Sequence, residues 1–171
     1  MLRRPLPAVA LLVLSVLSAW SVHASEIFED SFVEFIVPEG CVVDSSRPGD
    51  YRVLAAYDEQ APLVRIRLDV SGLSAEDLSR TGDVVERALR QGSHPDLVIE
   101  SREKSSIGER AALSYTYSYL IEGDSTRHVR ARALYAARSG RLVEVLCAAP
   151  VEEFDARWES AREVFESLRL Y

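Results

Sequence analysis

Residues 111–148 read AALSYTYSYLIEGDSTRHVRARALYAARSGRLVEVLCA, and three runs within them alternate with the two-residue period of a β-strand. In the first run, tyrosines recur at every second position and small hydroxyl side chains fill the positions between them. The predicted strands cover residues 111–121, 129–137 and 142–148, and the predicted turns are Glu122–Ser125 and Ser139-Gly140. Three consecutive strands joined by short turns indicate an antiparallel meander.

A long helix is predicted directly after this meander. Its apolar side chains recur three or four residues apart, the spacing that forms one face of a helix. They are Val151, Phe154, Trp158, Ala161, Phe165 and Leu168. Pro150 favours a helix start here, because the first turn does not need its missing N–H. An apolar stripe of this kind indicates core packing rather than contact with a cofactor.

The residues before the meander predict further strands and one more helix. Strands are expected over residues 32–37, 51–57 and 64–70, and a helix is expected from a cap at Ser74 to a stop at Gly92. A short apolar run at residues 97–99 leads into a charged stretch that ends at Gly108. This order of elements predicts an α+β domain in which an antiparallel β-sheet is flanked by helices, an α/β/α sandwich.

Residues 1–24 have the composition of a secretory signal peptide. Arg3-Arg4 is followed by an apolar stretch over residues 8–17 and by Val22-His23-Ala24, so cleavage is expected after Ala24. The apolar stretch is shorter than the roughly 20 residues of a membrane-spanning helix. A retained anchor is the alternative. The cleavage point itself has no cysteine, the nearest being Cys41, which argues against a lipoprotein. We therefore expect a periplasmic or secreted chain with one domain over residues 25–171 and no transmembrane segment after cleavage.

The net charge disfavours some classes of partner. Without residues 1–24 the chain loses two of its 20 Lys and Arg and none of its 27 Asp and Glu, so its net charge falls from −7 to −9. Nucleic acids and anionic lipids both favour a cationic surface. We therefore expect neither of them to be the main partner.

Cys41 and Cys147 both lie in the part of the chain that is expected to be exported. In an oxidising compartment an even number of cysteines favours a disulfide, so we predict a bond between them. The alternative is two separate buried thiols that pack as small apolar side chains.

No catalytic residue, metal site or cofactor is assigned from the sequence. The motifs of phosphate-binding loops, dinucleotide-binding folds, serine hydrolases and zinc proteases are missing. His94 and His128 lack partner motifs, and both are interpreted as solvated surface residues. The pairs Glu152-Glu153 and Glu163/Glu166 could chelate a cation, but acids opposite an apolar helix face are normally its solvated side.

Arginines alternate along two of the predicted strands, as Arg65/Arg67 and as Arg130/Arg132. In an acidic protein such arginines could bind a carboxylate, a phosphate or an acidic partner. With a four-residue turn after residue 121, Tyr117 faces Arg130 across the hairpin, and a slip of one residue separates them. The candidate binding residues are therefore Arg65, Arg67, Tyr117, Arg130 and Arg132. Alternatively, the arginines lie over apolar surface or pair with acids such as Glu144.

Several short motifs resemble those of the PsbP-like and DcrB-like exported domains, a fold shared by an extrinsic photosystem II subunit and a small Ran-binding nuclear protein. They are Phe32-x-x-Phe35-x-Val37-Pro38-Glu39-Gly40, Tyr115–Tyr119, Gly140-x-Leu142-x-Glu144-Val145, Ala149-Pro150 and Glu166-Ser167-Leu168-Arg169. The resemblance implies a sheet between helices and no catalytic residue. It also implies an accessory, docking or chaperone role, an inference from fold alone.

We therefore expect an exported, non-enzymatic accessory domain that binds another envelope protein. The alternative is a periplasmic module that binds a small molecule or a cation. An exported hydrolase is a third and weaker alternative, because an unfamiliar active site leaves no recognisable motif.

Overall fold

The computed structural model describes residues 25–55, 61–70, 78–91, 96–121 and 127–171. The predicted signal peptide, the Ser74 cap, the Gly92 stop, His94 and the turn at residues 122–125 lie outside these ranges. The described strands are β1 Glu26–Glu29, β2 Val33–Val37, β3 Cys41–Arg47, β4 Asp50–Ala55, β5 Val64–Arg67, β6 Val98–Ile107, β7 Arg110–Ile121, β8 Arg127–Arg138, β9 Arg141–Pro150 and β10 Arg169–Leu170. The described helices are α1 Leu78–Gln91 and α2 Val151–Ser167.

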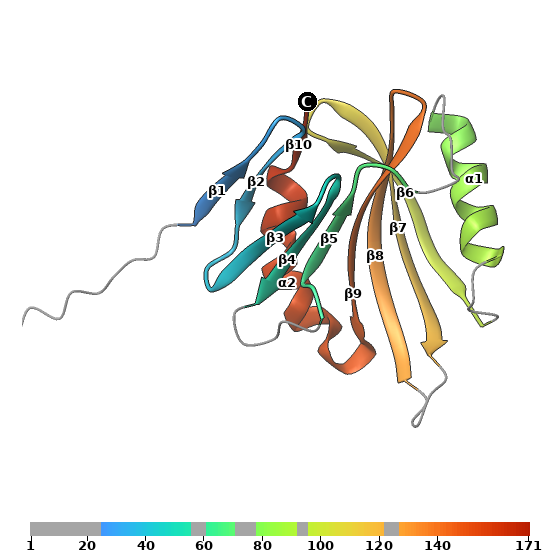
Figure 1. Ribbon diagram of the computed structural model, residues 1–171. Coiled ribbons are helices and arrows are strands. Elements are labelled where there is room, and N and C mark those ends of the chain that lie inside the picture. The colour runs from blue at the N-terminus through green and yellow to red at the C-terminus, as the bar shows by residue number, and fades with distance from the viewer. Residues whose placement is uncertain (1–24, 56–60, 71–77, 92–95, 122–126) are drawn as a thin grey trace, which may run out of the picture.

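The strands form a seven-stranded sheet with the order β3-β4-β5-β9-β8-β7-β6 and a three-stranded sheet with the order β1-β2-β10 (Figure 1). Every pairing is antiparallel. The predicted meander is confirmed, and β6 extends it to four neighbouring strands. Its tight turn is also confirmed, because Arg138 pairs with Arg141 across Ser139 and Gly140. Both turn residues have positive φ, 51° and 76°, as a two-residue hairpin turn requires.

Helix α2 lies in the main core, packed against β8 and β9 of the large sheet and against β2 of the small one. Its buried residues are Phe154, Ala161, Val164 and Phe165. The predicted apolar face is therefore mostly correct. The exception is Val151, which is 42% exposed because it lies in the first turn, at the end of the sheet.

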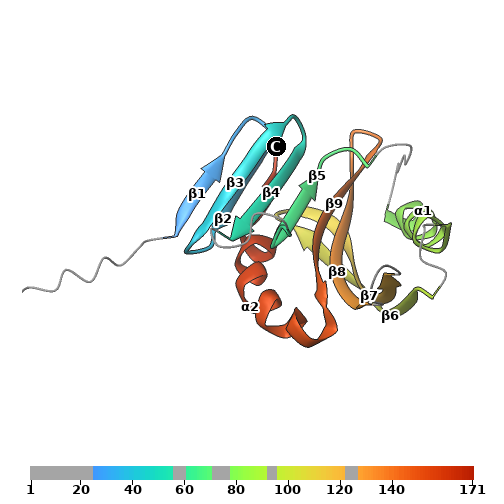
Figure 2. The same cartoon turned by 60° about the horizontal axis from the view of Figure 1, so that its bottom comes forward.

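Helix α1 covers the opposite face of the large sheet. Figure 2 shows the two helices on opposite sides of β7–β9, which confirms the predicted α/β/α arrangement. Val85 belongs to the same buried cluster as Leu113, Tyr115 and Leu142 on that face. The Arg102 guanidinium lies against Gly82 of this helix, where a Cβ would be 2.0 Å from it and would require the Arg102 side chain to shift.

Three strands and most of a fourth were not predicted. β1 and β10 are short and gain their pairing only from β2, and β3 mixes polar and apolar residues. The charged stretch before Gly108 is part of β6, which runs without a break to Ile107 and pairs with β7. β6 has another strand on one side only, so its side chains are largely solvated and carry little apolar alternation.

Candidate functional site

Arg65 and Arg67 of β5 both bind carboxylates within the sheet. Arg65 donates two hydrogen bonds to Asp50 of β4, at 2.8 and 2.6 Å. Its guanidinium lowers the pKa of Asp50, chiefly through those hydrogen bonds. Arg67 donates to Glu144 of β9, its direct cross-strand partner, with one bond of 2.7 Å and a second, shorter one. These arginines are structural ion pairs, as the alternative interpretation of the sequence proposed.

Glu144 connects this ion pair to two buried tyrosines. It is only 5% exposed, and its second carboxylate oxygen accepts a 3.0 Å hydrogen bond from the Tyr135 hydroxyl. Tyr117 lies within hydrogen-bonding reach of Tyr135. Burial raises the pKa of both tyrosines above 10. Tyr117 is thus a member of a buried polar chain that crosses four strands.

Arg130 and Arg132 of β8 lie on the opposite face of the sheet, over α2. The expected pairing of Tyr117 with Arg130 is wrong. Ile121 pairs with Arg127, so five residues rather than four separate the paired strand ends and the register shifts by one. Tyr117 lies opposite Ala131, and Arg130 lies opposite Ser118. A shift of one residue moves every side chain to the other face.

The two arginines on the α2 face differ from each other. Arg130 donates to Glu100 of β6 at 3.1 and 2.8 Å and lies over the ring of Phe154, at 5.4 Å. Arg132 lies over the indole of Trp158, with 4.4 Å between the guanidinium carbon and the ring centroid. Among the described residues, Arg132 has no carboxylate partner. It is the one member of the predicted set whose charge is not matched by an acid.

Arg132 and Trp158 line a hollow between α2 and strands β6 and β8, which we call the Arg132 groove. The groove has a volume of about 490 Å³. Its lining consists of Ser105, Ser106, Gly108, Arg132, Leu134, Trp158, Arg162, Phe165 and Glu166. Two arginines and the hydroxyl of Ser105 therefore face the same space as three apolar side chains, whereas the side chain of the next strand residue, Ser106, points to the other face of the sheet. The sequence analysis missed Ser105, because it did not predict that part of β6.

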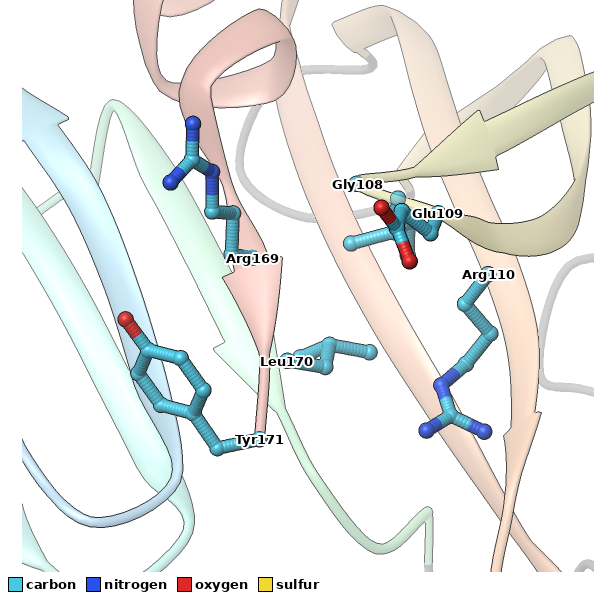
Figure 3. Close-up of a pocket in the computed structure, with 7 residues that line it drawn as sticks. Gly108, Glu109, Arg110, Arg169, Leu170 and Tyr171 are labelled. Carbon is cyan, nitrogen blue, oxygen red and sulfur yellow. The ribbon is translucent and has the colours of Figure 1, made fainter.

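Two other hollows are larger but their charged groups do not converge. One, of about 760 Å³, lies between the turn after β6 and strand β10 (Figure 3). The guanidinium groups of Arg110 and Arg169 point away from each other there, and Arg169 lies 3.4 Å from Glu34. The other, of about 890 Å³, runs along α2 beside Cys41 and includes Glu152, Glu153 and Glu163 in its lining. Within the described ranges, no three His, Cys, Asp or Glu residues form a potential metal site.

The predicted disulfide is absent, and Cys41 and Cys147 are both free thiols. Cys41 is in β3 and Cys147 in β9, with β4 and β5 between them. Three steps of about 4.8 Å separate them by roughly 14 Å, whereas the Cα atoms of a disulfide lie within about 7 Å. Burial raises the pKa of Cys147 to about 11. The alternative of separate, core-packed thiols is the one that the structure contains.

No protein-family model and no curated protein matches the chain. Solved structures do match it. CyanoP, the PsbP protein of Synechocystis sp. PCC 6803, aligns with a TM-score of 0.56 and 18% identity over 92% of this chain and 99% of its own. The chain has the PsbP-like fold. Saccharomyces cerevisiae Mog1p, a Ran-binding protein, has the same fold. It aligns with a TM-score of 0.57 and 9% identity over 86% of this chain and 95% of its own.

A third PsbP-like neighbour is LpqN of Mycobacterium tuberculosis, a protein involved in cell envelope biogenesis. It aligns with a TM-score of 0.53 and 13% identity over 86% of this chain and 90% of its own. At these identities the likeness is one of fold, so no residue role is transferred. In the part of the PsbP-like chain that the structure describes, neither helix is long and apolar enough to cross a membrane.

Proposed function

We propose that this chain is an exported, non-enzymatic accessory domain that binds another protein of the cell envelope at the Arg132 groove. Residues 1–24, with the composition of a signal peptide, support export. Two PsbP-like neighbours support the role: Mog1p is a Ran-binding protein, and LpqN is involved in cell envelope biogenesis. Both are analogies of fold.

The observation that carries the proposal is the pairing of Arg132 with Trp158 at the wall of an open groove. Arginine and tryptophan are enriched among the few residues that contribute most of the energy of protein interfaces. Because Arg132 already rests on the indole ring at 4.4 Å, less side-chain entropy is lost when a partner binds it. The other three candidate arginines are held by Asp50, Glu144 and Glu100.

A photocrosslinking amino acid at Ser105, which is exposed and points to the α2 face in the groove, tests this function in the native cell envelope. The matched control carries the same amino acid at Arg87, an exposed position of α1 on the opposite face. We expect one envelope protein to crosslink from position 105 and not from position 87, and Arg132→Ala to remove that product. Crosslinks of equal yield from both positions, or none from position 105, would contradict the proposal.

The size of the groove also favours a second candidate, a small-molecule-binding module. A volume of about 490 Å³ lies within the roughly 300–1,000 Å³ range of ligand sites. This candidate predicts that a metabolite raises the melting temperature of the protein in the absence of any partner. Arg132→Ala should abolish that rise if the ligand occupies the groove.

A further inference from the structure

The hydrogen-bonding state of Arg132 indicates what kind of group the groove accepts. Arg65, Arg67 and Arg130 each have a carboxylate oxygen within 2.8 Å of a guanidinium nitrogen. In the described residues Arg132 contacts the face of an aromatic ring instead. The ring stabilises the positive charge, but it accepts none of the in-plane N–H groups. Those donors are left for a ligand in the groove.

A second guanidinium strengthens the preference for an anion. Arg162 lines the same groove, and its ion-pair partners among the described residues are neighbours on its own helix, Glu159 at 3.3 Å and Glu166 at 3.7 Å. Exposed pairs of this kind contribute little and exchange easily. The lining holds two arginines against one acid, Glu166, and adds the hydroxyl of Ser105. The groove is therefore locally cationic on a chain whose net charge is −7.

The remaining wall of the groove is apolar. Leu134, Trp158 and Phe165 line it, and the rings of Trp158 and Phe165 meet edge to face with centroids 4.9 Å apart. When a ligand binds Arg132, an apolar group of that ligand would contact this wall, and the contact would bury the apolar side chains of the wall. Glu166, at the rim, disfavours a doubly charged group. A singly charged carboxylate beside an apolar or aromatic side chain satisfies all of these features.

We propose that the Arg132 groove binds an aspartate or glutamate side chain that lies next to an aromatic residue in the partner protein. Arg132 takes the carboxylate through its N–H edge, a geometry that a guanidinium can satisfy with two parallel hydrogen bonds. Ser105 supplies a further donor, and the aromatic side chain packs on Phe165. This inference rests on the proposed function and adds the chemistry by which the partner is recognised.

Trp158 provides a direct test. The chain has two tryptophans, Trp20 and Trp158, so the full chain with Trp20→Phe reports emission from the groove alone. The probes are two peptides, acetyl-Phe-Asp-Phe-amide and acetyl-Phe-Asn-Phe-amide, which differ only in the charge of the central side chain. We expect a saturable change in emission with the aspartate peptide and at least tenfold weaker binding of the asparagine peptide. Added salt should weaken the binding of the aspartate peptide and leave the binding of the asparagine peptide nearly unchanged.

Two variants test whether the preference for the aspartate peptide depends on Arg132. Arg132→Gln should abolish the preference for aspartate, whereas Arg65→Gln, on the other sheet face, should leave it unchanged. Melting curves establish that both variants fold. Equal binding of the two peptides, no saturable change with either, or an unchanged preference in Arg132→Gln would overturn the inference. Tighter binding of inorganic phosphate than of the aspartate peptide would overturn the assignment to a carboxylate.

These results are distinguishable from those for the proposed function. A crosslinked envelope partner together with equal binding of both peptides would leave the docking function intact and remove the carboxylate inference. Selective binding of the aspartate peptide without any crosslinked partner would leave the carboxylate inference intact and remove the docking function. It would then favour the small-molecule candidate.

Discussion

The pairs Arg65/Arg67 of β5 and Arg130/Arg132 of β8 share one local pattern and lie on opposite faces of the same sheet. On the α1 face, the first pair meets the carboxylates of Asp50 and Glu144. On the α2 face, Arg130 shares its charge between Glu100 and the ring of Phe154, and Arg132 meets only the indole of Trp158. The same spacing therefore yields structural ion pairs in one place and an available cation in the other.

Cross-strand neighbours explain the difference between Arg67 and Arg132. Arg67 lies directly opposite Glu144, so its partner is supplied within the sheet. Arg132 lies between Thr116 and Cys147, neither of which carries a charge. Its side chain extends instead over α2, where Trp158 is the contact. A strand neighbour is not required for an ion pair, because Arg130 lies between Ser118 and Ala149 and still reaches Glu100. Among the described residues, no acid reaches Arg132 in this way.

Loss of Glu144 should have the largest effect on stability. Glu144→Ala leaves Arg67 and Tyr135 without their acceptor, and we expect a loss of about 3 kcal/mol, the lower end of the range for a broken buried pair, because Arg67 is 32% exposed. Urea denaturation measures this loss in the free energy of unfolding. The matched control, Glu100→Ala, removes the acid of Arg130 on the α2 face and should cost less than about 1 kcal/mol. Equal losses would remove the distinction between the two faces.

Tyr135→Phe should have the next largest effect. It removes a buried hydrogen bond to a carboxylate, a loss of roughly 2 kcal/mol by the same measurement. Tyr171→Phe is the control, because the Tyr171 hydroxyl also donates to a carboxylate, Glu34, but on the surface. Because the pKa of Tyr135 is raised in the folded protein, this residue contributes fully to the free energy of unfolding below pH 10. That contribution is lost as the pH rises through the pKa of the folded protein. The stability of Tyr135→Phe should therefore fall less at alkaline pH than the stability of the parent.

Asp50→Asn should cost about 1 kcal/mol at neutral pH, because the pair that it breaks is partly exposed. The pKa of Asp50 is lowered from 3.8, so the contribution of the pair is present above that pH and is lost as the pH falls through the folded-state value. The difference between parent and variant should thus shrink in acid. Unfolding curves at pH 7 and pH 3 check this. A difference of the same size at both would show that the Arg65 pair does not act through its charge.

Arg132→Ala should have the smallest effect on stability, below about 1 kcal/mol, because a cation–π contact at a partly exposed site contributes little. In the full chain with Trp20→Phe, the emission of Trp158 should nevertheless change, since the charge over its ring is removed. Arg67→Ala should leave that emission unchanged. A loss of stability as large as that of Glu144→Ala would mean that Arg132 is a structural residue, like the arginines of β5.

Much of the fold was predictable from local spacing. The alternation of residues 111–148, the Ser139-Gly140 turn and the stripe from Phe154 to Phe165 all depend on neighbours a few positions away, and the structure contains each of them. β1, β3 and β10 were missed because they are short or mixed in pattern and are stabilised by pairing with distant strands.

The candidate site was only partly predictable. Local pattern alone identified the two arginine pairs and the tyrosines of β7, since alternation places every second side chain on one face. Which pair meets carboxylates and which meets aromatic rings depends on contacts that are remote in the chain: Arg67 with Glu144, and Arg132 with Trp158. A connection of five residues rather than four reversed the predicted juxtaposition of Tyr117 and Arg130. Such contacts follow from strand register and helix packing, which no short stretch of sequence encodes.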